Sequence, residues 1–152
     1  MVACIDRSPR SLDNKEMTSE AWQHESLHAM AEIKPLCNRL ASGLTRAGFT
    51  GREIFAVRLA LEEAVVNAIK HGNRCDPIKA VHVSYRVNTE DVLLNVEDEG
   101  MGFDPGDVAD PLSPENMDRS TGRGLLLMRH YMTWVKYNDR GNAVTLYKRR
   151  NG

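Results

Sequence analysis

The chain has 152 residues, of which 41% are hydrophobic, and this suits one globular domain with an ordinary core. Twenty Lys and Arg against twenty-one Asp and Glu give a net charge of −1, which excludes the global positive field typical of non-specific DNA binding or attachment to anionic membranes. The sequence has no signal-peptide pattern at its start and no apolar run of about eighteen residues, so we expect a cytoplasmic protein without membrane or direct nucleic-acid contact.

The three cysteines, Cys4, Cys37 and Cys75, are odd in number and far apart. This spacing fits neither a disulfide framework nor the paired cysteines of a zinc site. It agrees with a reducing compartment, as the cytoplasmic prediction requires.

Hydrophobic periodicity predicts one strand and two helices in the first half of the chain. Residues 1–19 are polar and aperiodic, so we expect a disordered tail before a single domain that spans residues 20–152. The elements expected in this half are a short strand over 22–29, a helix over 30–47 and a helix over 50–71. Thr50 and Glu53 form a capping box at the start of the second helix.

In the second half the period changes to two, which is typical of strands. The elements expected here are strands over 81–87 and 92–97, a helix over 124–132, and strands over 133–137 and 143–148 that flank a turn at Gly141 and Asn142. The order βααββαββ predicts an α+β fold: a two-layer sandwich in which three helices cover one face of a mostly antiparallel sheet.

A long connection over residues 99–121, rich in Gly and Pro, is predicted to be a lid because compact domains rarely keep such loops without a functional reason. Residues 97–118 hold eight acidic and no basic side chains, whereas residues 119–150 hold eight basic residues and one acidic residue. Charge runs of this kind are usually solvated faces, so a role for any one of these residues has to be argued from its position.

The second helix carries the first candidate constellation, Glu63, Asn67 and His71, spaced at i, i+4 and i+8. This spacing places the three polar side chains on one side of the helix, away from its apolar stripe. Ala56 and Ala60 share that side, which leaves room above it. An exposed polar face remains the alternative interpretation.

The second constellation is Asp98-Glu99-Gly100-Met101-Gly102. Asp98 is in phase with the apolar residues of the preceding strand, so its carboxylate is expected on the buried face, where it needs donors. A core hydroxyl or a backbone N–H could supply them. The alternative is a ligand amine, with the two glycines letting the backbone pass close to a flat ring.

The third constellation runs from Ser120 to Leu127 and places Gly122 and Gly124 at the predicted opening of a helix. Backbone N–H groups at a helix N-terminus favour a phosphate. By itself this signal is weak, because glycine-rich helix starts are common.

In this order and spacing, E-x-x-x-N-x-x-x-H, D-E-G-M-G-F and T-G-R-G-L resemble the GHKL ATPase superfamily, whose members bind ATP in the Bergerat fold. Within that superfamily the segments E-E-A-V-V-N-A-I-K-H-G and D-E-G-M-G look most like the anti-sigma factor serine/threonine kinases of bacterial partner-switching systems. The resemblance covers about residues 20–150.

The resemblance implies a role for each motif residue. Asn67 would coordinate the Mg²⁺ that bridges the phosphates, and Glu63 would be the general base. Asp98 would accept a hydrogen bond from the adenine amino group. The rest of the implied ATP-binding set consists of Gly100 and Gly102 beside the adenine, Gly122 and Gly124 beside the phosphates, His71, Thr121 and Leu125, and Arg119 or Arg123 as the contact to the γ-phosphate.

The function implied is that of a kinase that phosphorylates a STAS-domain antagonist and sequesters a sigma factor or another regulator, with ATP and Mg²⁺ as cofactors. A homodimer is also expected, both from the resemblance and from apolar residues near the start of the first helix, namely Trp22, Leu27 and Met30.

Two alternatives stay open. One is a catalytically weak, nucleotide-dependent binding module, and the other is a histidine-kinase-like ATPase domain. The second alternative needs a phosphoacceptor helix, and the pair His24-Glu25 looks only superficially like the start of one.

Overall fold

The computed structural model describes residues 21–101 and 120–151; in residues 120–123 it describes the backbone only. The helical elements are η1 (Met30–Glu32), α2 (Ile33–Ala47), α3 (Gly51–Asn67), η2 (Ala68–Gly72) and α4 (Ser120–Tyr131). The strands are β1 (Gln23–Leu27), β2 (Val81–Val87), β3 (Asp91–Glu97), β4 (Trp134–Tyr137) and β5 (Ala143–Arg149).

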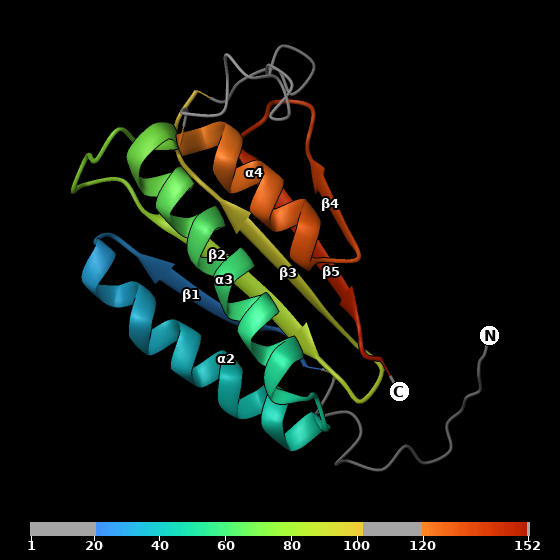
Figure 1. Ribbon diagram of the computed structural model, residues 1–152. Helices are drawn as coiled ribbons and strands as arrows, with labels where there is room; N and C mark the ends of the chain where they lie inside the picture. The colour runs from blue at the N-terminus through green and yellow to red at the C-terminus, as the bar shows by residue number, and fades with distance from the viewer. Residues whose placement is uncertain (1–20, 102–119, 152) are drawn as a thin grey trace, which may run out of the picture.

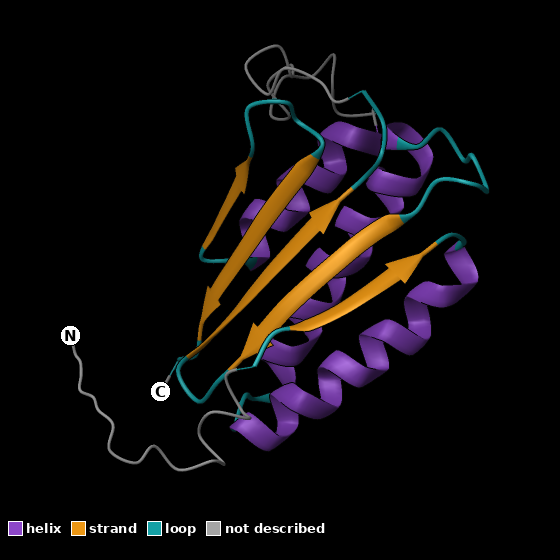
Figure 2. Cartoon of the chain, turned by 180° about the vertical axis from the view of Figure 1, so that it is seen from behind, coloured by secondary structure: helices purple, strands orange, loops and turns teal. Residues whose placement is uncertain are grey.

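The five strands form one sheet in the order β1-β2-β3-β5-β4, and every neighbouring pair is antiparallel. Helices α2, α3 and α4 lie on one face of this sheet (Figure 1). Seen from behind, the strands lie in front of all the helices (Figure 2). The predicted α+β two-layer sandwich and its element order are therefore confirmed.

The core lies between the sheet and the helices because both contribute an apolar face. On β3 the residues Val92, Leu94 and Val96 are at most 2% exposed, and they alternate with half-buried or exposed residues as the period of two predicts. Helix α3 buries Leu61 and its neighbours along the predicted stripe. Because this stripe packs in the core, a different side of α3 faces helix α4.

Helix α3 begins where the sequence predicts. Thr50 Oγ1 accepts a hydrogen bond from the Glu53 N–H at 3.1 Å, and Glu53 Oε1 accepts one from the Thr50 N–H at 2.8 Å. Glu53 Oε2 also accepts the N–H of Asn151 at 2.6 Å, so the same carboxylate ties the end of the chain to the start of the helix.

Three expectations for the first helix need correction. Its first turn is the 3₁₀ helix η1, and the preceding strand is shorter than residues 22–29. Leu27 is only 2% exposed and belongs to the core, whereas Trp22 and Met30 stay 42% and 37% exposed.

Among residues 21–101 and 120–151, no helix has the length and apolar character needed to cross a bilayer.

Candidate nucleotide-binding site

Glu63 and Asn67 lie on the side of α3 that faces α4. Ala56 and Ala60 on the same side are 5% and 0% exposed, so this side is packed against a helix. The expectation of open space above it is therefore wrong. Small residues let two helices approach closely. Glu63 and Asn67 are consequently half-buried.

Gly124 of α4 meets both of these side chains. A Cβ added at Gly124 would lie 2.8 Å from Asn67 Nδ2 and 3.0 Å from Glu63 Oε1. Glycine inside a helix usually costs about 1 kcal/mol relative to alanine, and here the missing side chain makes room for an amide and a carboxylate. The first and third motifs are thus in contact.

The environment of Glu63 suits a proton acceptor. Burial raises the pKa of its carboxyl, the neighbouring Glu62 raises it further, and Lys70 opposes the shift. A general base works best when its pKa approaches the working pH. The half-buried carboxylate of Glu63 therefore has the electrostatics expected of a base.

The end of α3 departs from the predicted geometry. The α-helix ends at Asn67 and continues as the π-helical segment η2, in which the Asn73 N–H bonds to the Ala68 carbonyl at 2.8 Å. This wider turn breaks the expected i+8 relation of His71 to Glu63. His71 nevertheless lines the pocket described below.

Asp98 follows β3 directly and is 9% exposed, as its phase in the strand predicts. Its Oδ1 accepts the Gly100 N–H at 2.8 Å. Burial raises the pKa of this carboxyl; the Gly100 N–H lowers it, Glu97 raises it, and Arg140 and Lys79 lower it. One local donor, the Gly100 N–H, thus offsets part of the cost of burying this carboxylate.

Two glycines let the Asp98 segment cross the end of η2. A Cβ on Gly72 would lie 2.2 Å from Asp98 Oδ2, and a Cβ on Gly100 would lie 1.9 Å from the Gly72 carbonyl oxygen. Both positions therefore exclude any side chain. The close approach expected between Gly100 and a ligand ring is in fact made first with the protein's own backbone.

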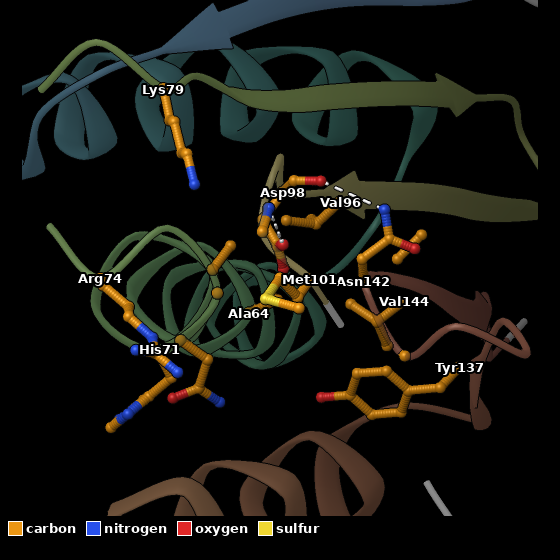
Figure 3. Close-up of a pocket in the computed structure, with 16 residues that line it drawn as sticks. Ala64, His71, Arg74, Lys79, Val96, Asp98, Met101, Tyr137, Asn142 and Val144 are labelled. Atoms are coloured by element: carbon orange, nitrogen blue, oxygen red, sulfur yellow. Dashed lines mark hydrogen bonds between the residues drawn. The ribbon is translucent and has the colours of Figure 1, made fainter. Parts of the chain in front are cut away.

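The Asp98 segment and the end of η2 line a cavity of about 480 Å³, within the size range of small-molecule sites. In Figure 3, His71 and Arg74 lie across the cavity from Asn142, Val144 and Tyr137. Asn67, Asp98 and Gly100 also line it. Burial raises the pKa of Tyr137 to about 12, so its hydroxyl stays neutral and can donate a hydrogen bond.

Two buried asparagines that support this pocket were missed in the sequence. Asn142 is 6% exposed, and its carbonyl accepts the Asp98 N–H at 2.8 Å. Its Nδ2 donates to the Asp98 carbonyl at 3.2 Å (Figure 3). Asn73 is 2% exposed; its Oδ1 accepts the Glu99 N–H at 2.8 Å and its Nδ2 donates to the Ala80 carbonyl at 3.0 Å. Asparagine is common in turns, as in the predicted turn at Gly141 and Asn142, so neither residue signals a role at a pocket.

The third motif is only partly described. Helix α4 begins at Ser120 and not at the predicted residue 124, so Gly124 lies one turn inside the helix. The close approach of Asn67 and Glu63 explains why a glycine occupies this position. Leu125 is 5% exposed and packs in the core. Outside the described residues lie the predicted tail, most of the predicted lid with Gly102 and Arg119, and the side-chain surroundings of Thr121, Gly122 and Arg123.

The residues around Asn67 fit a magnesium ion held together with a nucleotide. Asn67 Nδ2 is buried without a hydrogen-bond partner among the described atoms, and the amide oxygen at its other end is a ligand that hard cations accept. Mg²⁺ is usually bound through one or two protein oxygens plus phosphates and waters. Across the described part of the chain, no three His, Cys, Asp or Glu side chains gather into a metal site.

Comparison with known proteins agrees with this geometry. Residues 28–148 match the family described as the histidine kinase-like ATPase domain. An anti-sigma F factor of Clostridium perfringens is 32% identical over 108 residues, which cover 67% of this chain and 76% of the relative. The serine/threonine-protein kinase BtrW of Bordetella bronchiseptica is 30% identical over 105 residues, covering 66% and 74%. The serine-protein kinase RsbW of Listeria innocua is 29% identical over 140 residues, covering 84% and 89%.

The family match includes α3, the Asp98 segment, α4 and the strands between them. It therefore covers both ends of the site, and the predicted resemblance is confirmed. The chain belongs to the histidine kinase-like ATPase family of the GHKL superfamily.

Proposed function

We propose that this chain is a Mg²⁺-dependent serine/threonine protein kinase that phosphorylates a STAS-domain antagonist and sequesters a sigma factor or another regulator. One observation carries the proposal: the half-buried Glu63, whose pKa is raised, lies against Asn67 and Gly124 at one end of a site whose other end is the buried Asp98. In such a site the Asp98 carboxylate can accept a hydrogen bond from the edge of a nucleobase. The Glu63 carboxylate can accept the proton of a reacting hydroxyl.

Asp98 and the glycines beside it would hold the adenine. An adenine amino group is a donor, and the buried Asp98 carboxylate, whose one local donor is the Gly100 N–H on Oδ1, is a strong acceptor for it. The apolar residues Ala64, Val96 and Val144 line the same cavity and supply surface for a flat ring. The ATP triphosphate would then extend toward Asn67 and α4.

Phosphoryl transfer depends mainly on positioning and charge stabilisation. The serine oxygen of the substrate forms a bond to the γ-phosphorus while the bond to the β,γ-bridging oxygen breaks, and ADP leaves. Glu63 accepts the proton of the serine hydroxyl. When bound, Mg²⁺ would neutralise phosphate charge, and Asn67 would be its ligand from this chain.

The names of the relatives support the kinase activity and a sigma factor as a partner. BtrW and RsbW are named serine or serine/threonine kinases, and the Clostridium relative is named an anti-sigma factor. The exposed Trp22 and Met30 supply apolar surface for the expected homodimer.

The test uses radiolabelled γ-phosphate, a cognate STAS-domain protein and three variants. Glu63→Gln should bind ATP nearly as wild type does but transfer phosphate about 10²–10⁴-fold more slowly, because the amide cannot accept a proton. Glu62→Gln is the matched control, since it neutralises the adjacent, exposed carboxylate. It should transfer at close to the wild-type rate, because burial of Glu63, the larger cause of its raised pKa, is retained. Asn67→Ala should lose most Mg²⁺-dependent nucleotide affinity.

Two results would contradict the kinase assignment. If wild type binds ATP but transfers nothing to any STAS partner, the nucleotide-dependent binding module becomes the better description. If Glu63→Gln transfers as fast as Glu62→Gln, the Glu63 carboxylate is not the base. A histidine-kinase role has no support at His24, which lies on strand β1 with its Nδ1 2.9 Å from Ser84 Oγ.

A further inference from the structure

The segment Asp98–Gly100 is held from two sides. On one side Asn142 bonds to the Asp98 backbone. On the other side the anchor is Glu99, a residue that no motif interpretation uses. Its carboxylate does not line the cavity and bonds to residues at the start of β2.

Glu99 makes three hydrogen bonds that fix it in place. Its Oε2 lies 2.7 Å from His82 Nε2, its Oε1 accepts the Ala80 N–H at 3.2 Å, and its own N–H donates to Asn73 Oδ1 at 2.8 Å. His82 Nδ1 in turn lies 3.1 Å from Ser26 Oγ on β1. The network therefore connects the Asp98 segment to two strands and to the end of η2.

The pair of His82 and Glu99 within this network is exposed, and this limits what the pair contributes to stability. The side chains of His82 and Glu99 are 46% and 43% exposed. Exposed ion pairs add little to global stability because water screens them. The hydrogen bond from His82 and then that from the Ala80 N–H lower the pKa of Glu99, so its carboxylate stays charged at neutral pH. The remaining effect is local and concerns the position of the backbone on either side of residue 99.

We propose that Glu99 is a positioning residue for the nucleotide, and that His82 holds it in place. Anchoring the Glu99 carboxylate to β2 keeps the Asp98–Gly100 turn pressed against Gly72, and this sets the direction of the Asp98 carboxylate. The inference rests on the proposed binding of ATP to this pocket. Glu99 itself does not contact the nucleotide.

The test uses the full chain, with two measurements on each variant. Calorimetric titration gives the affinity for Mg·ATP, and NMR hydrogen exchange gives the protection of the Gly100 amide, which donates to Asp98 Oδ1. The variants are Glu99→Ala, Glu99→Gln and His82→Ala. Glu97→Ala is the matched control, because it removes an exposed carboxylate equally near Asp98 in sequence.

Glu99→Ala should weaken ATP binding on the order of fivefold to tenfold and speed Gly100 exchange by a similar factor, with an unchanged melting temperature. Glu99→Gln should recover part of both, because its amide oxygen can still accept one of the two donors. His82→Ala should weaken binding in wild type but have no further effect in Glu99→Ala, since the two act as a unit.

Glu97→Ala should bind like wild type. Equal weakening by Glu97→Ala and Glu99→Ala would show a simple charge effect and overturn the inference. So would unchanged Gly100 exchange in Glu99→Ala. If wild type binds no nucleotide, the proposed function falls, and Gly100 exchange still decides whether Glu99 fixes the turn.

Discussion

Replacing Asp98 with asparagine separates recognition from stability at this site. The variant keeps the size of the side chain and an oxygen for the Gly100 N–H, but it loses the charge and can present a donor toward adenine. Loss of one charge-assisted hydrogen bond costs about 1.5–3 kcal/mol, so Mg·ATP and Mg·ADP should bind roughly ten- to a hundredfold more weakly.

The effect on stability should have the opposite sign. Burial raises the pKa of Asp98 in the folded chain, so the charged carboxylate destabilises the fold increasingly as pH rises through that raised pKa. At pH 7 the neutral asparagine removes this cost, and we expect a melting temperature equal to or above that of wild type.

Calorimetric titration and thermal unfolding check the two expectations on the same sample. Asp139→Asn is the control, because it neutralises an exposed carboxylate in the hairpin that also carries Asn142. Unchanged ATP affinity in a folded Asp98→Asn variant would remove Asp98 from the site. An unfolded variant would instead show that the charge is needed for the fold.

Further predictions concern the rest of the site and the assembly. Gly124→Ala places a methyl group 2.8 Å from Asn67 Nδ2, so phosphotransfer should fall at least about tenfold while helix propensity keeps the chain folded; kinase assay and circular dichroism check this. Gly100→Ala meets the Gly72 carbonyl at 1.9 Å and should lower the free energy of unfolding by about 1–3 kcal/mol in urea titration. Because the pKa of Glu63 is raised, transfer should decline on acidification at a higher pH than an ordinary glutamate would give, a midpoint that Glu63→Gln should abolish in a pH–rate profile. Light scattering at tens of micromolar should report a homodimer, and a monomer with and without nucleotide would contradict it.

Patterns set by neighbouring residues were predictable from the sequence. The capping box at Thr50 and the alternation along β3 depend on a few adjacent side chains, and both occur as expected. The burial of Asp98 followed from that alternation, because it continues the phase of the strand by one more step.

Features that depend on distant contacts were not predictable. The π-helical turn at the end of α3 accompanies the crossing of Gly72 and Gly100, two residues from different elements. Asn142 reaches Asp98 across 44 positions of sequence, and no local period encodes such a contact. The helical packing over Ala56 and Ala60 is likewise a tertiary fact, since small residues fit an open face equally well.

The pocket is assembled from the end of α3, the end of β3 and the β4–β5 hairpin, so an unfolded chain cannot contain it. A ligand that binds only the native state shifts the folding equilibrium toward that state by mass action. At a free concentration about a hundred times its Kd, a nucleotide would add about 2.7 kcal/mol to the free energy of unfolding. The supply of nucleotide would then also affect how long each copy of this protein survives proteolysis.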